Sequence, residues 1–288
     1  RVKMQKQLNA WYEGKKGQVI TSKECKEFLL DIDYLLEEGG DFLIDTENVD
    51  EEIADISGPQ LVVPITNSRY AINAVNARWG SFYDALYGTD AIDDITKIKQ
   101  YDPLRGAKVI SYAKKHLDKI APLHKVSWNQ IIDIRREGKE IKFFLNSNSY
   151  TGLVDDKQIA GLIFDSKKRI EELILVKNNL HCRVVVNPNS PIGKSDPANI
   201  SDIILESAIS SILDCEDSVS TVDAEDKLLA YRNWLGLMKG NLESEFIKNK
   251  QKINRVMNDD IEITTLSGKK KFLKGRSLML IRNVGHLM

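Results

Sequence analysis

The stretch RSLMLIRNVGHLM, residues 276–288, decides how we interpret the fold. After Ser277 the chain has an uninterrupted apolar run up to Ile281, which is typical of a strand buried on both faces. Arg282 and Asn283 follow this run directly. An unpaired guanidinium beside a core strand is costly, so we expect Arg282 to face a polar pocket. That pocket should lie at the carboxyl end of the strand, where barrels and open α/β folds place their ligands.

The composition describes a globular protein without a bias toward charged partners. At 288 residues the chain can form one large or two ordinary domains, and its formal net charge of −1 gives no electrostatic reason to expect nucleic acid or a membrane surface. No apolar run approaches the roughly 18 residues of a membrane span. The three cysteines lack CxxC spacing and indicate reduced thiols in a cytoplasmic protein. Because residue 1 is arginine, we expect the chain to be a piece of a longer protein.

The first forty residues have a helical pattern. Thr21 and Glu24 have the spacing of a capping box, and an apolar stripe runs from Phe28 to Leu36 on the helix that follows. We expect the Gly39-Gly40 pair to end this helix. The acidic residues 45–57 lack the ligand alternation and central glycine of a calcium loop, so the sequence predicts an exposed linker there.

The next part of the chain changes from a strand and a helical segment to a pattern of antiparallel hairpins. The sequence predicts a strand at 61–65, with a proline near its end, and then a helical, aromatic-rich segment at 69–87. A helix near 105–120 follows. Two hairpins are expected beyond it, turned at Glu137-Gly138 and at Asn178-Asn179. A helix with antiparallel hairpins indicates an α+β unit.

A strand followed by a helix, the pattern seen at 61–87, occurs again after this unit. Residues 209–213 form another buried-strand run, and an amphipathic helix at about 223–239 should end at Gly240. Charged, loop-like sequence then separates this helix from the apolar run at 277–281. The strands 61–65, 209–213 and 277–281 could be successive members of one parallel barrel. The α+β unit would then be an insertion between the first two strands.

An acidic run follows the second of these strands: Leu213-Asp214-Cys215-Glu216-Asp217-Ser218. Carboxylates and a hydroxyl at the carboxyl end of a strand have the composition of a magnesium neighbourhood, because Mg²⁺ prefers oxygen ligands. The same residues also suit a polar loop that caps the following helix. The residues alone leave these two interpretations open.

Three blocks of sequence carry a family resemblance. They are PQLVVPITNSRYAINAVNARWGSFYDALYGTDAI (59–92), SAISSILDCEDSVSTVDAEDKLLAYRNWLGLMKGNL (207–242) and GRSLMLIRNVGHLM (275–288). Together they resemble malate synthase in its long bacterial G form, and the chain corresponds to an amino-terminal portion. The resemblance implies an α/β fold with an amino-terminal helical clasp and a (β/α)8 TIM-type barrel. An inserted α/β domain interrupts this barrel after its first strand, and a helical plug follows the barrel.

The resemblance also divides the chain into segments. They are the helical clasp and linker (1–57), the first barrel strand with the helical segment after it (58–92), the inserted α/β domain (93–206), a barrel strand and helix (207–239), the return to the inserted domain (240–275) and a further barrel strand (276–288). The barrel would be incomplete within these residues.

The activity implied by the resemblance is that of an acyltransferase that converts the acyl group to alkyl on transfer. Acetyl-CoA condenses with glyoxylate in a Claisen-type step, and thioester hydrolysis gives malate and CoA, a reaction of the glyoxylate cycle. Chemically this step needs a base for a methyl proton, a cation such as Mg²⁺ to polarise the aldehyde, and positive charge where the enolate oxygen develops. The parent protein is expected to be cytoplasmic and monomeric.

Carried over by position, the resemblance gives roles to individual residues. Arg282 matches the catalytic arginine that contacts glyoxylate and stabilises the enolate. Glu216 and Asp217 match acidic residues that border the magnesium site without binding the ion directly. The matches to acetyl-CoA contacts are Val62, Arg69, Tyr70, Ser218 and Arg255.

Other family residues have no position here. The direct Mg²⁺ ligands, a glutamate and an aspartate, belong to later barrel strands, and the catalytic base belongs to the carboxyl-terminal domain. Residues 1–288 alone are therefore expected to be inactive. The alternative from another functional class is a non-catalytic acyl-CoA-binding or interaction module.

Overall fold

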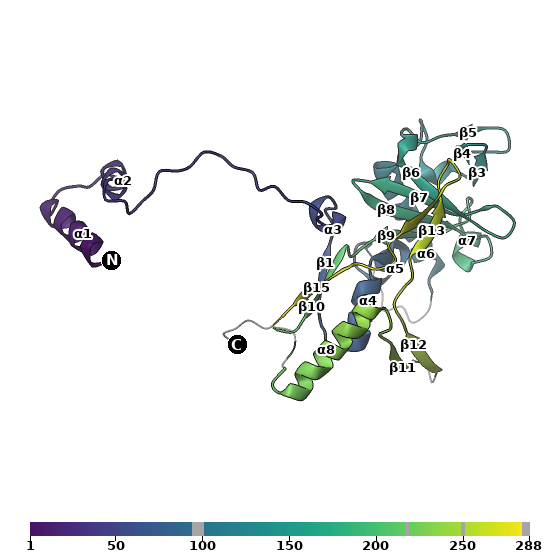
Figure 1. Cartoon of the computed structure of the whole chain (residues 1–288). Coiled ribbons are helices and arrows are strands. Elements are labelled where there is room, and N and C mark those ends of the chain that lie inside the picture. Colours follow the sequence, from purple (N-terminus) through teal and green to yellow (C-terminus); the bar gives the residue numbers. More distant parts are fainter. Residues whose placement is uncertain (94–100, 217–218, 220, 249–250, 284–288) are drawn as a thin grey trace. The chain divides into compact units, whose positions relative to one another are not determined.

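The structure, a computed structural model, describes residues 1–93, 101–216, 219, 221–248 and 251–283. The chain forms two units, Arg1–Val49 and Asp50–Met288, which are considered separately. Figure 1 shows their helices and strands. Among the described residues, no helix is both long and apolar enough to cross a membrane.

The first unit contains two helices, α1 (Val2–Gly14) and α2 (Ser22–Asp31). The predicted capping box at the start of α2 is confirmed, since Thr21 Oγ1 accepts the Glu24 N–H and the Glu24 carboxylate accepts the Thr21 N–H. The prediction that the helix continues to Gly39-Gly40 is wrong. The helix ends at Asp31, and Asp33 adopts a left-handed backbone with φ 57°. Tyr34 N–H then bonds the Leu29 carbonyl, as in a Schellman-type helix end.

The second unit contains most of the regular structure. Its helices are α3 (Glu51–Ala54), α4 (Ser68–Asn76), α5 (Phe82–Gly88), α6 (Pro103–Ile120), α7 (Pro191–Lys194) and α8 (Ala224–Lys239), with short 3₁₀ turns at Trp128–Gln130 and Asp156–Gln158. Its strands are β1 (Gln60–Pro64), β2 (Trp79–Ser81), β3 (Asp133–Glu137), β4 (Glu140–Phe144), β5 (Tyr150–Thr151), β6 (Ile159–Phe164), β7 (Ile170–Lys177), β8 (Leu180–Val186), β9 (Ile200–Glu206), β10 (Ser210–Asp214), β11 (Ser244–Lys248), β12 (Gln251–Arg255), β13 (Ile261–Thr264), β14 (Lys270–Leu273) and β15 (Leu278–Arg282).

The three strands expected in one parallel sheet are neighbours in that sheet. Their order is β1-β10-β15, and both pairs are parallel, so Pro64, Asp214 and Arg282 lie in one row. Helices α4 and α8 contribute Ile72 and Leu237 to the core of this part. This confirms the strands and their direction, while a closed barrel stays a prediction. The expectation that the last strand is buried on both faces is wrong, because every residue of β15 is half-buried.

A larger antiparallel sheet contains the expected hairpins. Its strand order is β14-β13-β6-β7-β8-β9-β2, and β3-β4-β5 form a smaller sheet beside it. The predicted turn at Asn178-Asn179 is confirmed, with φ 51° and 62° as a two-residue turn of type I′ requires. Gly138 has φ 64° in the other predicted hairpin. Helix α6 packs on this region with buried apolar residues, as its periodicity predicted.

Two segments differ from the sequence-based prediction. The aromatic segment at 69–87 is not one helix, because α4 ends at Asn76 and the chain adds β2 to the edge of β9 before α5 begins. The charged sequence at 240–275 is not loop-like, since it forms β11 to β14. Its strands carry Lys and Glu on exposed positions, which is common on edge strands and hides the alternation of apolar residues.

The acidic linker at 45–57 is also only partly exposed. Its short helix α3 places Glu52 in the interior, where the side chain is 1% exposed and lies 2.8 Å from both Arg78 Nη1 and Lys274 Nζ. Arg78 Nη2 in turn lies 2.9 Å from Glu206 Oε1. We call Glu52, Arg78, Glu206 and Lys274 the junction cluster. Arg78, Glu206 and Lys274 lie where the chain passes between the parallel sheet and the larger sheet.

Candidate functional site

The carboxyl ends of β1, β10 and β15 form one edge of the parallel sheet. Because the three strands are parallel and in register, the residues that follow Pro64, Asp214 and Arg282 leave the sheet on the same side. Helix α4 begins directly after β1, where the Asn67 side chain accepts the Tyr70 N–H at 3.1 Å. This carboxyl edge therefore collects the acidic run, Arg282 and the first turn of α4.

Arg282 is held at this edge by a carboxylate. Its Nε and Nη2 atoms each lie 2.8 Å from an oxygen of Asp214, in the two-pronged geometry that suits a guanidinium. The Asp214 side chain is completely buried, whereas that of Arg282 is 39% exposed. A buried carboxylate requires a cationic partner, so Asp214 fixes the plane of the guanidinium while part of it faces solvent.

The acidic run contributes a second carboxylate beside this pair. Glu216 Oε2 lies 3.8 Å from Arg282 Nε, and the Glu216 N–H donates to Asp214 Oδ1 at 2.9 Å. The loop after β10 thus turns back onto the carboxylate that orients Arg282. Between the two, burial and then the neighbouring Asp214 raise the pKa of the Cys215 thiol, which keeps it protonated at neutral pH.

The predicted neighbourhood of a magnesium ion is only partly described. Asp217 and Ser218 lie outside the described residues. Among the residues that are described, no group of three or more His, Cys, Asp or Glu could hold a metal ion. Asp214 forms an ion pair with Arg282, and Glu216 is the other described carboxylate of the acidic run at the carboxyl edge of the sheet. The described residues do not by themselves make a magnesium site.

The structure brings two of the predicted acetyl-CoA contacts, Arg69 and Arg255, to one aromatic ring, and a third, Tyr70, lies against Arg69. The Arg69 guanidinium lies 5.4 Å from the Tyr70 ring centroid and 5.2 Å from that of Phe246, in β11. Arg255, at the end of β12, lies 6.0 Å from the same Phe246 ring. Tyr70 is 46% exposed, so the group is open to a ligand. We call these four residues the aromatic-arginine cluster.

Val62, the other predicted acetyl-CoA contact that the structure describes, lies on the parallel sheet. It occupies the middle of β1, pairs with Ile212 in register and is 51% exposed. A half-exposed valine on a sheet face can cover an apolar ligand surface. Its role in binding stays a prediction.

Two residues of these sites had been given no role from sequence. Asp214 is part of the acidic run. Its pairing with Arg282 depends on a strand register that links positions 68 residues apart. Phe246 lies in a charged segment that was expected to be loop-like. The adjacent apolar pair Phe246-Ile247 in this segment was the available signal, and it is too short to identify a shared ring.

The sequence of the chain is similar to that of known proteins. A family model described as "Malate synthase G, alpha-beta insertion domain" matches residues 101–178. Proteins named "Malate synthase G" match the whole chain, with 46% identity in Halalkalibacterium halodurans, 42% in Corynebacterium glutamicum and 43% in Corynebacterium efficiens. The chain covers 40%, 39% and 38% of these relatives, respectively, and thus spans about two fifths of their length. Over all 288 residues the chain is thus similar to an equivalent part of malate synthase G proteins, and its residues 101–178 match the insertion domain of that family.

Proposed function

We propose that the protein of which this sequence is part is a malate synthase. It would condense acetyl-CoA with glyoxylate and hydrolyse the thioester to malate and CoA, as an acyltransferase of the glyoxylate cycle in the cytoplasm. The observation that carries the proposal is the match of the entire chain to malate synthase G relatives at 42–46% identity. The position of the predicted residues Arg282 and Glu216 beside each other at one sheet edge supports it further.

Arg282 is the residue to which we assign a catalytic role. Its guanidinium is permanently charged and carries N–H donors in a plane, which suits both a carboxylate of glyoxylate and a forming enolate oxygen. The contact with Asp214 fixes this plane before substrate arrives. A donor that is already oriented stabilises developing charge without reorganisation during the reaction.

The aromatic-arginine cluster is the part that we assign to acetyl-CoA. Arg69 and Arg255 would contact the phosphates of the nucleotide, and the rings of Tyr70 and Phe246 provide faces for stacking. Ser218 and Val62 belong to the same proposed surface. Two of its residues, Arg69 and Tyr70, lie in the first turn of α4, which begins at the carboxyl edge, so a bound thioester could reach Arg282.

The remaining features of the family complete the proposal. They are a closed (β/α)8 barrel, the segment boundaries given above, a monomeric state and a requirement for Mg²⁺ with Glu216 and Asp217 at the border of its site. Bound Mg²⁺ would polarise the aldehyde of glyoxylate. We expect its direct ligands and the catalytic base to be absent from residues 1–288.

A second candidate is a non-catalytic acyl-CoA-binding module. The exposed position of the aromatic-arginine cluster favours it, because such a surface can bind a nucleotide without any reaction. The two candidates predict the same affinity for acetyl-CoA and differ in turnover.

The release of free CoA thiol distinguishes the candidates. We would measure it with a thiol reagent, with and without glyoxylate and with and without Mg²⁺, on the longer protein and on residues 1–288. The malate synthase proposal expects glyoxylate- and Mg²⁺-dependent release from the longer protein, and none from residues 1–288. Acetyl-CoA binding without release in the longer protein would establish the binding module instead. Release by residues 1–288 would show that the base or the metal site is misassigned.

A further inference from the structure

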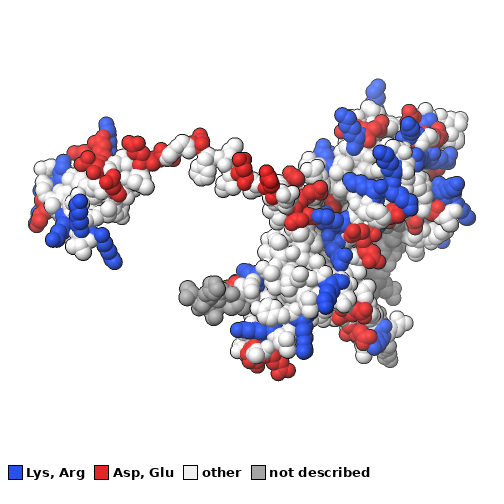
Figure 2. All heavy atoms as spheres, viewed as in Figure 1, with Lys and Arg blue, Asp and Glu red and all other residues white. Residues whose placement is uncertain are grey.

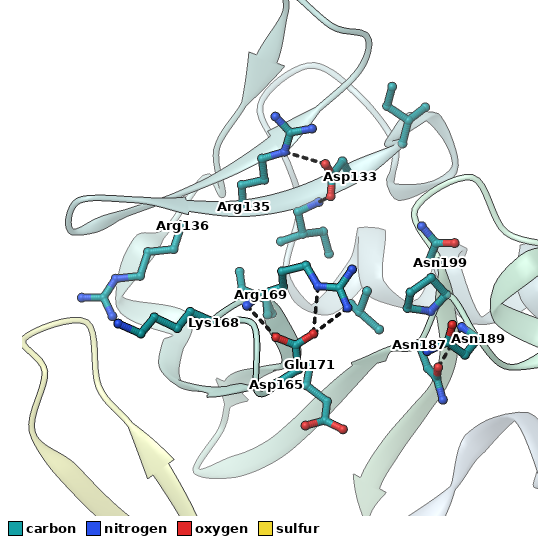
Figure 3. A pocket seen from close by; sticks show the side chains of 15 residues that line it. Asp133, Arg135, Arg136, Asp165, Lys168, Arg169, Glu171, Asn187, Asn189 and Asn199 are labelled. Carbon is teal, nitrogen blue, oxygen red and sulfur yellow. Dashed lines mark hydrogen bonds and ion pairs between the residues drawn. The ribbon is translucent and has the colours of Figure 1, made fainter.

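A cleft in the part of the chain that contains the larger sheet has no role in the proposed reaction. Its volume is about 740 Å³, and it is lined by β3, the turn between β6 and β7, and the segments around Asn187 and Asn199. Figure 3 shows these side chains around the open space. Figure 2 shows Lys and Arg interspersed with Asp and Glu over this part of the molecule. The lining of the cleft itself carries four cationic side chains and three carboxylates, Asp133, Asp165 and Glu171, so that cations are in excess and the cleft is a candidate site for an anion.

Two of the arginines in the cleft are neutralised by their own partners. Arg135 Nε lies 2.6 Å from Asp133 Oδ2, and Arg169 Nη2 lies 2.7 Å from Asp165 Oδ2. Both pairs are partly exposed, which limits their contribution to stability. Their positive charge is matched, so they shape the walls of the cleft more than they attract a ligand.

The other two cations of the cleft, Arg136 and Lys168, form no ion pair with a residue that the structure describes. Arg136 donates from Nε to the Gly138 carbonyl at 2.8 Å and from Nη2 to the Leu266 carbonyl at 3.0 Å, so its guanidinium is held by neutral groups. The Lys168 side chain points toward Arg136 in Figure 3 and makes no ion pair within 4.0 Å with a described residue. Two like charges that face one side of a cleft repel each other, and an anion between them removes this repulsion.

Amide side chains line another part of the cleft. Asn187, Asn189 and Asn199 all contribute to it. Asn187 Oδ1 accepts the Asn189 N–H at 3.0 Å, and Asn199 adopts a left-handed backbone with φ 58°, so both are held by local structure. Amides can donate to and accept from the carbonyl and hydroxyl groups of a ligand. The cleft thus offers charge at one side and neutral hydrogen-bonding groups at another.

We propose that this cleft binds a small organic anion with two or more phosphate or carboxylate groups. Arg136 and Lys168 contact its anionic oxygens, and the three asparagines contact its neutral polar groups. The volume accommodates a molecule of the size of a common metabolite. The proposal is independent of the acetyl-CoA and glyoxylate sites, because none of the residues assigned to them lines this cleft.

A calorimetric titration of the whole chain tests this proposal. The probes are pyrophosphate for phosphate oxygens, citrate for carboxylates and sorbitol as an uncharged control, at low ionic strength. The test variant is Arg136→Gln with Lys168→Gln. The matched control is Lys139→Gln with Lys167→Gln, which removes the same charge from exposed residues that do not line the cleft.

The expected result is saturable binding of at least one of the two anions to the unaltered chain and to the control. The test variant should bind it about ten-fold more weakly or not at all. Preference for pyrophosphate or for citrate identifies the oxygen type. Should the double variant fail to fold, Lys168→Gln alone should still weaken binding, since this side chain is exposed. Binding of neither anion, or equal loss in test variant and control, would overturn the proposal.

Discussion

Replacing Arg78 by methionine should destabilise the second unit strongly. The guanidinium lies 2.8 Å from Glu52 and 2.9 Å from Glu206, and the three side chains are 5%, 1% and 2% exposed, respectively. Removal of one partner from a buried ion pair costs about 3–5 kcal/mol, because the remaining charge is buried without compensation. Glu52 keeps Lys274 at 2.8 Å and Glu206 keeps His181 at 3.1 Å, so we expect the lower end of this range.

Urea unfolding at pH 7 measures this effect. The control is Arg135→Met, which breaks an arginine–aspartate pair of similar length whose arginine is 61% exposed. It should change the free energy of unfolding by at most about 1 kcal/mol. A change below about 1 kcal/mol for Arg78→Met as well would show that the junction cluster is not a stabilising unit, and the reasoning would fail.

The pH dependence supplies a second check on the same cluster. Burial acts to raise the pKa of both Glu52 and Glu206, but the cationic neighbours outweigh it, and the net pKa of each is lowered in the folded state. A lowered pKa stabilises the fold above the unfolded-state value of about 4.3, and this stabilisation is lost as the pH falls through the folded-state value. In Arg78→Met the carboxylates protonate more easily. The difference in stability between the variant and the unaltered chain should therefore shrink as the pH is lowered from about 7 toward about 4.

Three predictions concern the proposed function of the longer protein. Arg282→Lys keeps the charge but loses the two-pronged contact with Asp214. We therefore expect kcat to fall by about 10²–10³-fold, with little change in the KM for acetyl-CoA. A near-normal kcat would limit Arg282 to a structural ion pair. Asp214→Asn should lower both the melting temperature and kcat, because the buried partner of the guanidinium loses its charge, and a change in melting temperature alone would separate the two roles. Phe246→Ala should weaken acetyl-CoA binding by about ten-fold in a calorimetric titration, whereas Phe272→Ala, at a ring that is 60% exposed in β14, should not; equal effects would exclude Phe246 from the site.

The strands of the parallel sheet could be predicted because each carries a short apolar run between polar segments, although β1 and β15 are only partly buried. The turn at Asn178-Asn179 was predictable for another local reason, since both residues tolerate a positive φ. The contact between Asp214 and Arg282 was not, because it depends on a register between strands that no local pattern encodes. The burial of Glu52 likewise depends on Arg78 and Lys274, which lie far along the chain. An acidic segment appears exposed in sequence until its distant cations are known.

The two ends of the parallel sheet carry different kinds of ion pair. The junction cluster lies before β10 and β15, where Arg78 Nη1 also donates to the Arg276 carbonyl at 3.2 Å, and both residues of its Arg78–Glu206 pair are buried. The pair at the carboxyl ends, Arg282–Asp214, has only its carboxylate buried. A strand such as β10 separates the two ends by about 13 Å, at roughly 3.3 Å for each residue. Groups this far apart act independently, so the fully buried Arg78–Glu206 pair can fix the fold without constraining the partly exposed Arg282–Asp214 pair at the other end.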